Sequence, residues 1–515
     1  MIPVISLSRP AVRQIEIKDY IFCILSAVLL IFSLSSFNLW LLAWFGFVPL
    51  LLALQDKKSL SAFLLSYLTG IIFWWGTIYW LVHVTLLGQI ILILYLALYF
   101  GLFGLIVSAV RNRPHTMRLF AIPSFWVLLE YIRAHLFTGF PWAILGYSQY
   151  RNLPIIQIAD ITSAWGVSFL VMMVNVAIYS TEKGRKRYKL TAICLVCVLI
   201  YGFYKINQLS INKEETALKI SVIQGNIAQK LKWDKEARGL ILNKYFNLSA
   251  QAAKGNPDLI IWPEAALPVV LEEEPVYYER VSKFSQKINT PLLLGAVTSK
   301  NNLYYNSAIL ISAEGQTISE YNKLHLVPFG EYIPLKKMLP FLETIVPIGD
   351  IAPGKDYTLF TLPVIPLSPA SASGRRSAVN FSVLICFEDL FPELSQRFVK
   401  KGADFLINIT NDAWYKKTSA PYQHLMASVF RAIENRVFLV RSANTGISGF
   451  IAPAGKIISL VKGKYKRKIF VDGYDSQELI MPKEKNLSFY SRYGDVFILF
   501  CLVLGLYNTL PLLKK

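Results

Sequence analysis

A cysteine at the end of an apolar run is the first candidate for chemistry in this sequence. Cys386 stands in "LICFEDLFPE", after the strand-like "VNFSVLIC" and before an acidic segment that can begin a helix, whereas the other four cysteines lie within long apolar runs. A single cysteine is more often a small buried hydrophobic residue than a nucleophile. Because a thiol must lose its proton to react, a reactive Cys386 needs a base or a positive charge nearby.

Two further segments supply groups of that kind. "IIWPEAALP" ends a strand-like run with Glu264, and "YNKLHLVPFGEYIP" carries Lys323 followed by Glu331. A carboxylate can take the thiol proton, a task worth ~10²–10⁴ in rate. An ammonium can stabilise a tetrahedral oxyanion together with backbone N–H groups, and one such donor is worth ~10²–10³. Each residue alone is typical of a solvated loop, but together with Cys386 they suit acyl transfer.

These segments lie in a region whose pattern predicts an α/β domain. Between residues 215 and 485, short β-rich runs alternate with helical stretches at 235–254, 390–401 and 422–436. Nearly continuous apolar strands indicate a sheet that is covered on at least one face. Functional groups in open α/β folds gather at the carboxyl ends of strands. We therefore expect the carboxylate, the ammonium and the thiol to lie close together.

The rest of the chain is apolar enough to lie in a membrane. The sequence is 54% hydrophobic and only 17% charged, which is unusual for a soluble protein of this length. Eight apolar stretches come close to the ~17–25 residues that cross the hydrocarbon core as a helix. They are residues 20–36, 38–54, 61–83, 86–110, 119–137, 163–181, 190–206 and 496–513. We predict a polytopic α-helical membrane domain of seven helices at 1–210, and an eighth helix with a cytoplasmic tail at 490–515.

The distribution of basic residues predicts the orientation of these helices. Lys and Arg gather before the first stretch and in every second loop, whereas the loop at 138–162 carries only Arg151. The positive-inside rule places the basic loops and both termini in the cytoplasm, so that seven crossings deliver the α/β domain to the outer face. The basic residues before the first stretch would also suit a signal peptide, but no small-x-small cleavage site follows. Because topology accounts for much of the net charge of +20, we expect no nucleic-acid partner.

The three segments, in the order Glu–Lys–Cys, resemble the nitrilase superfamily of carbon–nitrogen hydrolases. Together with the spans and "FTGFPWAILGYSQ" at 137–149, they make the chain similar to the apolipoprotein N-acyltransferase family over nearly its whole length. The resemblance implies a nitrilase-like αββα sandwich in the periplasm of a bacterium, anchored in the inner membrane. It also implies that Glu264 is the general base, Lys323 the oxyanion stabiliser and Cys386 the nucleophile.

The same resemblance implies roles for four further residues. Glu331 would support the lysine, and Glu388 corresponds to another acidic position that the family needs. Phe387 stands where relatives often have Tyr, so only its backbone N–H is expected to serve the oxyanion. Trp233 in "KLKWD" looks like a family tryptophan near the lipid site.

The implied reaction has two halves. Cys386 attacks an ester of a phospholipid, with phosphatidylethanolamine as the expected acyl donor, and gives a thioacyl-enzyme and a lysophospholipid. The α-amino group of the diacylglyceryl-cysteine of an apolipoprotein then takes the acyl chain, which is the last step of lipoprotein maturation. The partners are thus membrane lipids and lipid-anchored proteins. No cofactor is implied, and the five histidines lack the spacing of a metal site. We expect a monomer, since the spans would hinder the dimer packing of soluble nitrilases.

Two segments have more than one interpretation. Residues 332–353 form a proline-interrupted apolar arm with Phe341 and Leu342. This arm either dips into the membrane interface and gates lipid access or packs on the domain core. Glu130 and Arg133, at i and i+3 in the fifth stretch, are expected to form a structural pair, with headgroup binding as the alternative.

Two other functions use much of the same pattern. A membrane-tethered amidase or nitrilase would use the same three residues and pass the acyl group to water. It differs from a transferase in that an amine-bearing lipopeptide would not outcompete hydrolysis. A catalytically dead lipid-binding or scaffold protein would keep its function after Cys386→Ala.

Overall fold

The computed structural model describes residues 13–179, 186–209, 215–232, 234–328, 330–332, 351–363, 378–482 and 485–509. Their contacts divide them between two compact units. The first unit draws on Met1–Gln149, Ala164–Leu199 and Val496–Lys515, and the second on Tyr150–Ser163 and Ile200–Asp495. The domain boundaries expected at residues 210 and 490 stay a prediction, and residues 150–163 group with the second unit.

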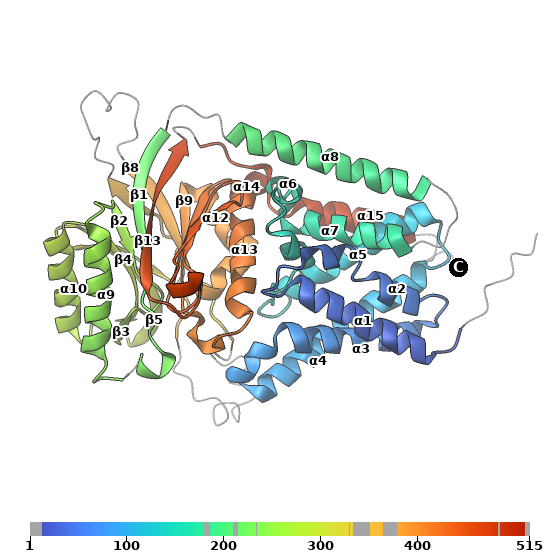
Figure 1. The fold of residues 1–515 in the computed structure, drawn as a ribbon, viewed down its shortest axis with the longest axis horizontal. Coiled ribbons are helices and arrows are strands. Elements are labelled where there is room, and N and C mark those ends of the chain that lie inside the picture. Colours follow the sequence, from blue (N-terminus) through green and yellow to red (C-terminus); the bar gives the residue numbers. More distant parts are fainter. Residues whose placement is uncertain are drawn as a thin grey trace, which may run out of the picture. The chain divides into compact units, whose positions relative to one another are not determined.

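Apolar helices build the first unit (Figure 1). The helices that lie wholly or partly in it are α1 (Ile17–Ser33), α2 (Val48–Ala53), α3 (Ser59–Thr77), α4 (Leu86–Val110), α5 (His115–His135), α7 (Ala159–Tyr179), α8 (Lys186–Leu209) and α15 (Val496–Thr509). Three 3-10 turns join them, η1 (Trp40–Trp44), η2 (Tyr79–His83) and η3 (Leu145–Gln149).

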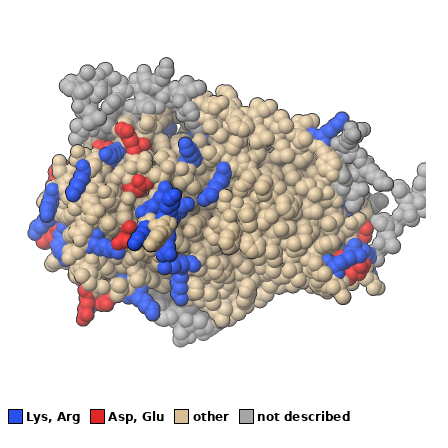
Figure 2. Space-filling view, in the orientation of Figure 1, with Lys and Arg blue, Asp and Glu red and all other residues tan. Residues whose placement is uncertain are grey.

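Four of these helices are long and apolar enough to cross a membrane. They are Ser59–Thr77, Leu86–Val110, Ala159–Tyr179 and Tyr188–Gln208. Several helices expose large apolar side chains, such as Ile200 on α8 and Val503 on α15, each 65% exposed. In Figure 2 the surface of the first unit is mostly free of charged side chains. Apolar surface of this extent is unfavourable in water and is typical of contact with lipid.

The prediction of eight spans is met only in part among the described residues. The stretch 38–54 is not one helix, because it divides into η1 and α2. Pro49 lies in the first turn of α2, where its missing N–H costs nothing, whereas inside a continuous helix it would break the hydrogen-bond ladder. Helix α1 has 17 residues and α15 has 14, and α5 carries Glu130 and Arg133 among its buried residues.

Loops that carry basic residues meet at one end of the first unit. Lys57 donates to the Asp19 carboxylate over 2.5 Å, and Arg13 binds the same carboxylate. Arg111, at the end of α4, donates to the Lys57 carbonyl oxygen over 2.6 Å. The start of α1, the loop before α3 and the end of α4 therefore share one side, as the predicted topology requires.

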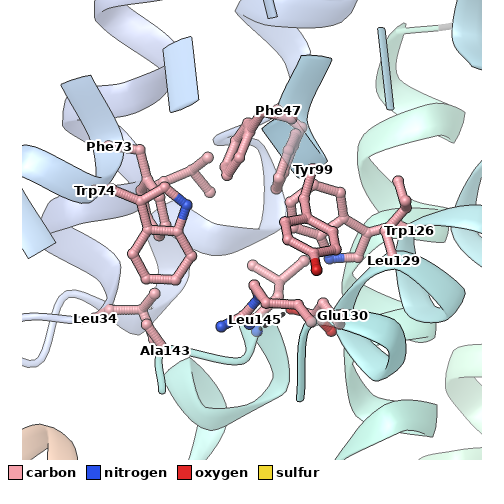
Figure 3. A pocket seen from close by; sticks show the side chains of 13 residues that line it. Leu34, Phe47, Phe73, Trp74, Tyr99, Trp126, Leu129, Glu130, Ala143 and Leu145 are labelled. Carbon is pink, nitrogen blue, oxygen red and sulfur yellow. Dashed lines mark hydrogen bonds between the residues drawn. The ribbon is translucent and has the colours of Figure 1, made fainter. Parts of the chain in front are cut away.

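Glu130 and Arg133 have a structural role in fixing the segment 137–149. Glu130 Oε1 accepts a hydrogen bond from the backbone N–H of Leu145 over 2.7 Å. Arg133 donates to two carbonyl oxygens of the same segment, those of Phe140 and Trp142, over 2.6 and 2.8 Å. The two charges lie beside a small apolar cavity of about 20 Å³ (Figure 3), which is roughly the space of one water molecule. No ion pair joins the two side chains in the described part of the chain, so each acts through the backbone of the segment that it holds.

Two β-sheets form the centre of the second unit. One sheet has seven strands in the order β13-β1-β2-β4-β5-β6, with β3 paired to β4, and the other has six in the order β12-β11-β10-β9-β8-β7. The strands of the first sheet are β1 (Glu215–Gln224), β2 (Leu259–Ile261), β3 (Leu267–Val270), β4 (Leu292–Lys300), β5 (Leu303–Ile311), β6 (Thr317–Asn322) and β13 (Gly473–Pro482). Those of the second are β7 (Phe360–Pro363), β8 (Ala378–Ile385), β9 (Phe405–Thr410), β10 (Phe438–Ala443), β11 (Gly449–Ile451) and β12 (Ile457–Leu460).

Helices cover both outer faces of the two sheets. Figure 1 shows α9 (Arg238–Ala253) and α10 (Pro275–Ile288) beside the seven-stranded sheet, with α12 (Pro392–Lys401) and α13 (Ala420–Asn435) beside the six-stranded one. Strands β1 and β10 contact each other across the two sheets, as do β5 and β8. The unit is therefore an αββα sandwich, completed by the short helices α6 (Leu153–Ile156) and α14 (Phe489–Tyr493).

The strands that position the candidate site are central and buried. All residues of β2 and β9 are buried, because these strands have neighbours on both edges and layers on both faces. β2 runs parallel to β1 and β4, and β8 and β10 run parallel to β9. The ends of β2 and β8 therefore carry the loops with Glu264 and Cys386, as expected for functional groups in α/β folds.

Candidate active site

The structure brings the three residues of the predicted site together. Glu264 follows β2, Lys323 directly follows β6 and Cys386 directly follows β8. Lys323 Nζ lies 3.9 Å from Glu264 Oε1, and the charges of both residues act on the Cys386 thiol. The three residues are only 8%, 1% and 9% exposed, respectively. The site is therefore a buried cluster of two charges and a thiol at the strand ends.

Glu264 is held where two strands approach each other closely. Strand β4 passes so near that a Cβ on Gly295 would lie 2.6 Å from the backbone nitrogen of Ala265, so only glycine fits there. Ala265 itself has a left-handed φ of 44°. Asn306 of β5 donates from Nδ2 to Glu264 Oε1 over 2.8 Å, which fixes the direction of the carboxylate.

Glu331 holds Lys323 in its charged form. Lys323 Nζ lies 2.8 Å from Glu331 Oε2, and Asn306 Nδ2 donates to Glu331 Oε1 over 2.7 Å. Asn306 thus joins the carboxylates of Glu331 and Glu264. Burial disfavours the ammonium, but the charges of Glu331 and Glu264 outweigh it and raise the pKa of Lys323 above its usual value. The ammonium form of Lys323 is therefore favoured in the resting site.

Cys386 sits on a sharp turn between β8 and the 3-10 turn η6 (Cys386–Leu390). Its φ is 52°, a left-handed conformation that costs a residue other than glycine ~1–3 kcal/mol and persists only when its surroundings enforce it. Asn408 of β9 enforces it by donating to the carbonyl oxygens of Leu384 and Cys386, each over 3.1 Å. His424 Nε2 lies 3.2 Å from the same Cys386 oxygen.

The Cys386 thiol is protonated at rest. Burial raises the pKa of Cys386 above its usual value, and the Glu264 charge raises it further, whereas Lys323 lowers it. A thiol in this state is a weak nucleophile, so its reaction requires a base that takes the proton as the thiol attacks. Glu264, whose charge acts on this thiol, is the candidate for that task.

Glu388 joins the lysine loop to the cysteine turn. Its Oε1 accepts hydrogen bonds from the two backbone N–H groups that follow Lys323, over 2.7 and 3.0 Å, and its Oε2 accepts one from Ile385 over 2.7 Å. Tyr321 donates its hydroxyl to the same carboxylate over 2.8 Å. Burial raises the pKa of Glu388 to about 7. Glu388 thus positions Lys323 and Cys386 relative to each other through the backbone.

The remaining predicted residues are only partly described. Phe387 is buried, and its ring centroid lies 5.1 Å from that of Phe391, so its side chain packs on the domain. The residues predicted to contact lipid, together with most of the predicted arm at 332–353, lie outside the described residues; they are Trp233, Phe341 and Leu342.

A buried charge cluster behind the cysteine turn was missed by the sequence analysis. His424 Nε2 lies 2.7 Å from Asp389 and its Nδ1 lies 3.0 Å from Asp412. Arg441 of β10 reaches the same two carboxylates over 3.0 and 3.4 Å. Burial and the Arg441 charge oppose protonation of His424, but the two aspartates outweigh them and raise its pKa to about 9. The charges of two aspartates are thus balanced by those of His424 and Arg441 behind the cysteine turn. In the sequence, the one indication of this cluster was an aspartate directly after Glu388.

A buried lysine beside Glu264 was also missed. Lys232 is 4% exposed, and its Nζ donates to the Glu264 carbonyl oxygen over 2.9 Å. Burial lowers the pKa of Lys232 to about 8, although the charges of Glu264 and Cys386 act in the opposite direction. Lys232 and Lys323 together balance Glu264 and Glu331, so that the site carries no net charge when all four are ionised.

Two family models match the chain. The apolipoprotein N-acyltransferase N-terminal domain matches residues 26–177, and carbon-nitrogen hydrolase matches residues 219–474. The chain is 39% identical to the apolipoprotein N-acyltransferase of Geobacter metallireducens over 523 residues, which cover 96% of this chain and 95% of that one. It is 30% identical to that of Pasteurella multocida, with 86% and 87% covered, and 28% identical to that of Chlorobaculum tepidum, with 96% of each covered. The chain belongs to the apolipoprotein N-acyltransferase family.

Among solved structures, the chain is similar to an amidase from Nesterenkonia sp. at 17% identity, with 56% of this chain and 97% of that one covered and a TM-score of 0.39. Within this family, the segment that matches carbon-nitrogen hydrolase contains every described residue of the candidate active site. The segment that matches the N-terminal domain contains Glu130, Arg133 and the loop that they hold. Both units of the chain therefore carry family features.

Replacing Arg441 is expected to destabilise the protein. Arg441→Met leaves Asp389 and Asp412 buried with fewer partners, and breaking a buried pair in this way costs ~3–5 kcal/mol. We expect a clearly lower Tm of the detergent-purified protein by scanning fluorimetry, with partial recovery in Arg441→Lys. The exposed Lys462→Met is the matched control. An unchanged Tm in Arg441→Met would show that the cluster does not hold the cysteine turn.

Replacing Lys232 is expected to change the pH dependence of thioester formation. In the native protein the rate should fall as the pH rises through about 8, because Lys232 then loses the charge that opposes Glu264 and the developing thiolate. Lys232→Met should react ~10²-fold more slowly, at the low end of the ~10²–10³ that one electrostatic donor is worth, and should lack this alkaline fall.

The readout for Lys232 is the initial rate of acyl transfer to Cys386, measured from pH 6 to 10 by intact-protein mass spectrometry. Lys235→Met removes an exposed charge nearby and should leave the profile as it is. A purely structural role of Lys232 would lower the rate equally at all pH values, and an alkaline fall that persists in Lys232→Met contradicts the prediction.

Proposed function

We propose that Cys386 carries the acyl group in the reaction of this chain, as a thioester between two lipid substrates. The chain is an N-acyltransferase of lipoproteins by its family. The observation that supports the route through Cys386 is the placement of Glu264 and Lys323 around a buried thiol on a constrained turn.

In the first half of the proposed reaction, a phospholipid ester enters with its carbonyl carbon beside Cys386 Sγ. Glu264 takes the thiol proton as the sulfur attacks, and the oxyanion is stabilised by the Lys323 ammonium. When the tetrahedral intermediate collapses, the ester C–O bond breaks and the departing lysophospholipid oxygen takes the proton from Glu264. The products are a thioacyl-enzyme and a lysophospholipid, and Glu264 is ionised again.

In the second half, the α-amino group of a diacylglyceryl-cysteine attacks the thioester carbonyl. Glu264 accepts a proton from the attacking nitrogen, and Lys323 again stabilises the oxyanion. The C–S bond breaks, an amide forms, and the thiolate regains its proton from Glu264. Because Glu331 keeps Lys323 charged throughout, the same residues serve both halves without a change of protonation at the lysine.

We also propose the identity of the acyl donor, the oligomeric state and the membrane topology. Phosphatidylethanolamine is the acyl donor, the protein is a monomer, and eight crossings place the α/β domain in the periplasm with both termini in the cytoplasm. The four long apolar helices and the shared end of the basic loops support this topology. The positive-inside rule then assigns that end to the cytoplasm.

The thioester can be tested directly. Full-length protein incubated with phosphatidylethanolamine alone should gain the mass of one acyl chain, and hydroxylamine should remove it. Cys386→Ala should gain none, and Glu264→Gln should gain it at least ~10²-fold more slowly because the base is lost. Acyl transfer to a diacylglyceryl lipopeptide should then consume the adduct. A normal turnover rate in Cys386→Ala would end the proposal, and loss of the adduct to water in preference to the lipopeptide would favour a hydrolase.

The topology can be tested with reporter enzymes. Alkaline phosphatase fused after residue 215 should be active, because it folds only when its disulfides form outside the cytoplasm, and the same reporter fused at Lys57 should be inactive. The opposite pattern would invert the topology, and equal activity at both positions would remove the proposed crossings between them.

A further inference from the structure

A cavity in the second unit lies apart from the candidate active site. It has a volume of about 340 Å³ and is lined by residues of five separate segments. Three of its lining residues are cations, Arg151, Lys456 and Lys468. Among the described residues that line it, none is Asp or Glu, and none is Glu264, Lys323 or Cys386.

The three cations are not neutralised by the described part of the protein, since none of them forms an ion pair there. Burial lowers the pKa of Lys468, and the charges of Arg151 and Lys462 lower it further. Like charges that converge without a counter-ion cost free energy, and a bound anion would remove that cost. The surrounding sequence has the same sign, because Lys456–Val471 contains six Lys or Arg and no Asp or Glu. Figure 2 shows several basic side chains gathered on this unit.

The fold holds the backbone that carries these cations. The Gln224 side chain donates to the Lys468 carbonyl oxygen over 3.1 Å and accepts from Ser448 Oγ over 2.7 Å. Lys456 follows a tight turn at Gly455, whose φ is 79°. The Arg151 guanidinium lies over the Tyr150 ring, 5.3 Å from its centroid. The fold thus fixes the backbone positions from which Lys456 and Lys468 extend, and an aromatic contact orients Arg151.

The other walls of the cavity indicate an amphiphilic ligand. Leu425, Ile457 and Leu460 line it beside the cations, and Tyr422 adds a phenol. Arg and Lys bind phosphate oxygens through charge-assisted hydrogen bonds, whereas apolar walls suit a glycerol backbone and the start of acyl chains. A volume of about 340 Å³ is also within the ~300–1,000 Å³ that is usual for small-molecule sites.

We propose that this cavity binds the phosphate of a phospholipid headgroup, at a site separate from the one at Cys386. The ligand phosphate contacts Arg151, Lys456 and Lys468, and its glycerol side contacts the apolar wall. The proposal does not depend on the thioester, because no residue of the candidate active site lines the cavity.

Arg151 also has a place in the sequence that agrees with this role. It is the one basic residue in the loop 138–162, on the side where the positive-inside rule disfavours Lys and Arg. A basic residue on that side needs an explanation other than topology. Binding of a lipid phosphate in this cavity would explain why a basic residue lies there.

The test is binding of dihexanoyl-phosphatidylglycerol to the full-length chain in a neutral detergent, measured by isothermal titration calorimetry. The variant Arg151→Gln/Lys468→Gln should bind at least about tenfold more weakly, because two charge-assisted hydrogen bonds to the phosphate are lost. The matched control is Lys464→Gln/Lys466→Gln, which removes the same charge from the same loop outside the cavity lining. It should change the Kd by no more than about twofold, as expected for screened surface charges.

Each outcome supports or overturns the proposal. Equal weakening in the control means that a diffuse basic surface binds the lipid, and unchanged binding in the cavity variant means that the site is elsewhere. Inorganic phosphate that binds as tightly as the lipid would make free phosphate the ligand. The Tm of each variant in detergent, compared with that of the native chain, reports whether it is folded. If the double variant is not folded, the exposed Lys456→Gln replaces it with an expected loss of ~3-fold or more, and unchanged binding there also overturns the proposal.

Discussion

The burial of charge around Cys386 is the constraint on which the rest of the structure depends. A thiolate and an oxyanion cannot form in a site of low polarity unless cations lie beside them. The second unit solves this with two carboxylates, Glu264 and Glu331, and two ammonium groups, Lys323 and Lys232. In the proposed reaction these charges still cancel after the proton moves from sulfur to Glu264, because a thiolate then takes the place of the carboxylate.

Such a balance works only if the groups stay in place, and the sandwich provides the scaffold. Glu388 joins the lysine loop of one sheet to the cysteine turn of the other through backbone hydrogen bonds. Behind that turn, His424 and Arg441 bind Asp389 and Asp412, and Asn408 fixes the strained backbone of Cys386. Both sheets therefore contribute to the site, which explains why its residues are so widely spaced along the chain.

Local patterns in the sequence were sufficient to predict several strands and helices of the second unit. Apolar runs ending in Glu264 and Cys386 predicted strands β2 and β8 with their functional ends, and helices α9, α12 and α13 lie within a few residues of the predicted ranges. Four buried residues around the site were not predicted: Lys232, Asn306, His424 and Arg441. Each contacts the site through residues that are far away in the sequence, so no local pattern indicates its position. The prediction of a single helix at 38–54 was wrong, because apolar composition does not show whether a helix continues past a proline such as Pro49.

The same burial suits the proposed reaction, in which one site serves two lipids in turn. A thioester in contact with water would hydrolyse while the enzyme waits for its second substrate, whereas one in a nearly closed site is protected. Cys386 is 9% exposed, so solvent has little access to its sulfur. The cost is a thiol whose pKa is raised and which cannot attack unaided. Glu264 offsets that cost only when a substrate carbonyl is present to receive the sulfur, because the proton moves as the new bond forms. Protection of the intermediate and dependence on the base are thus two consequences of one buried position.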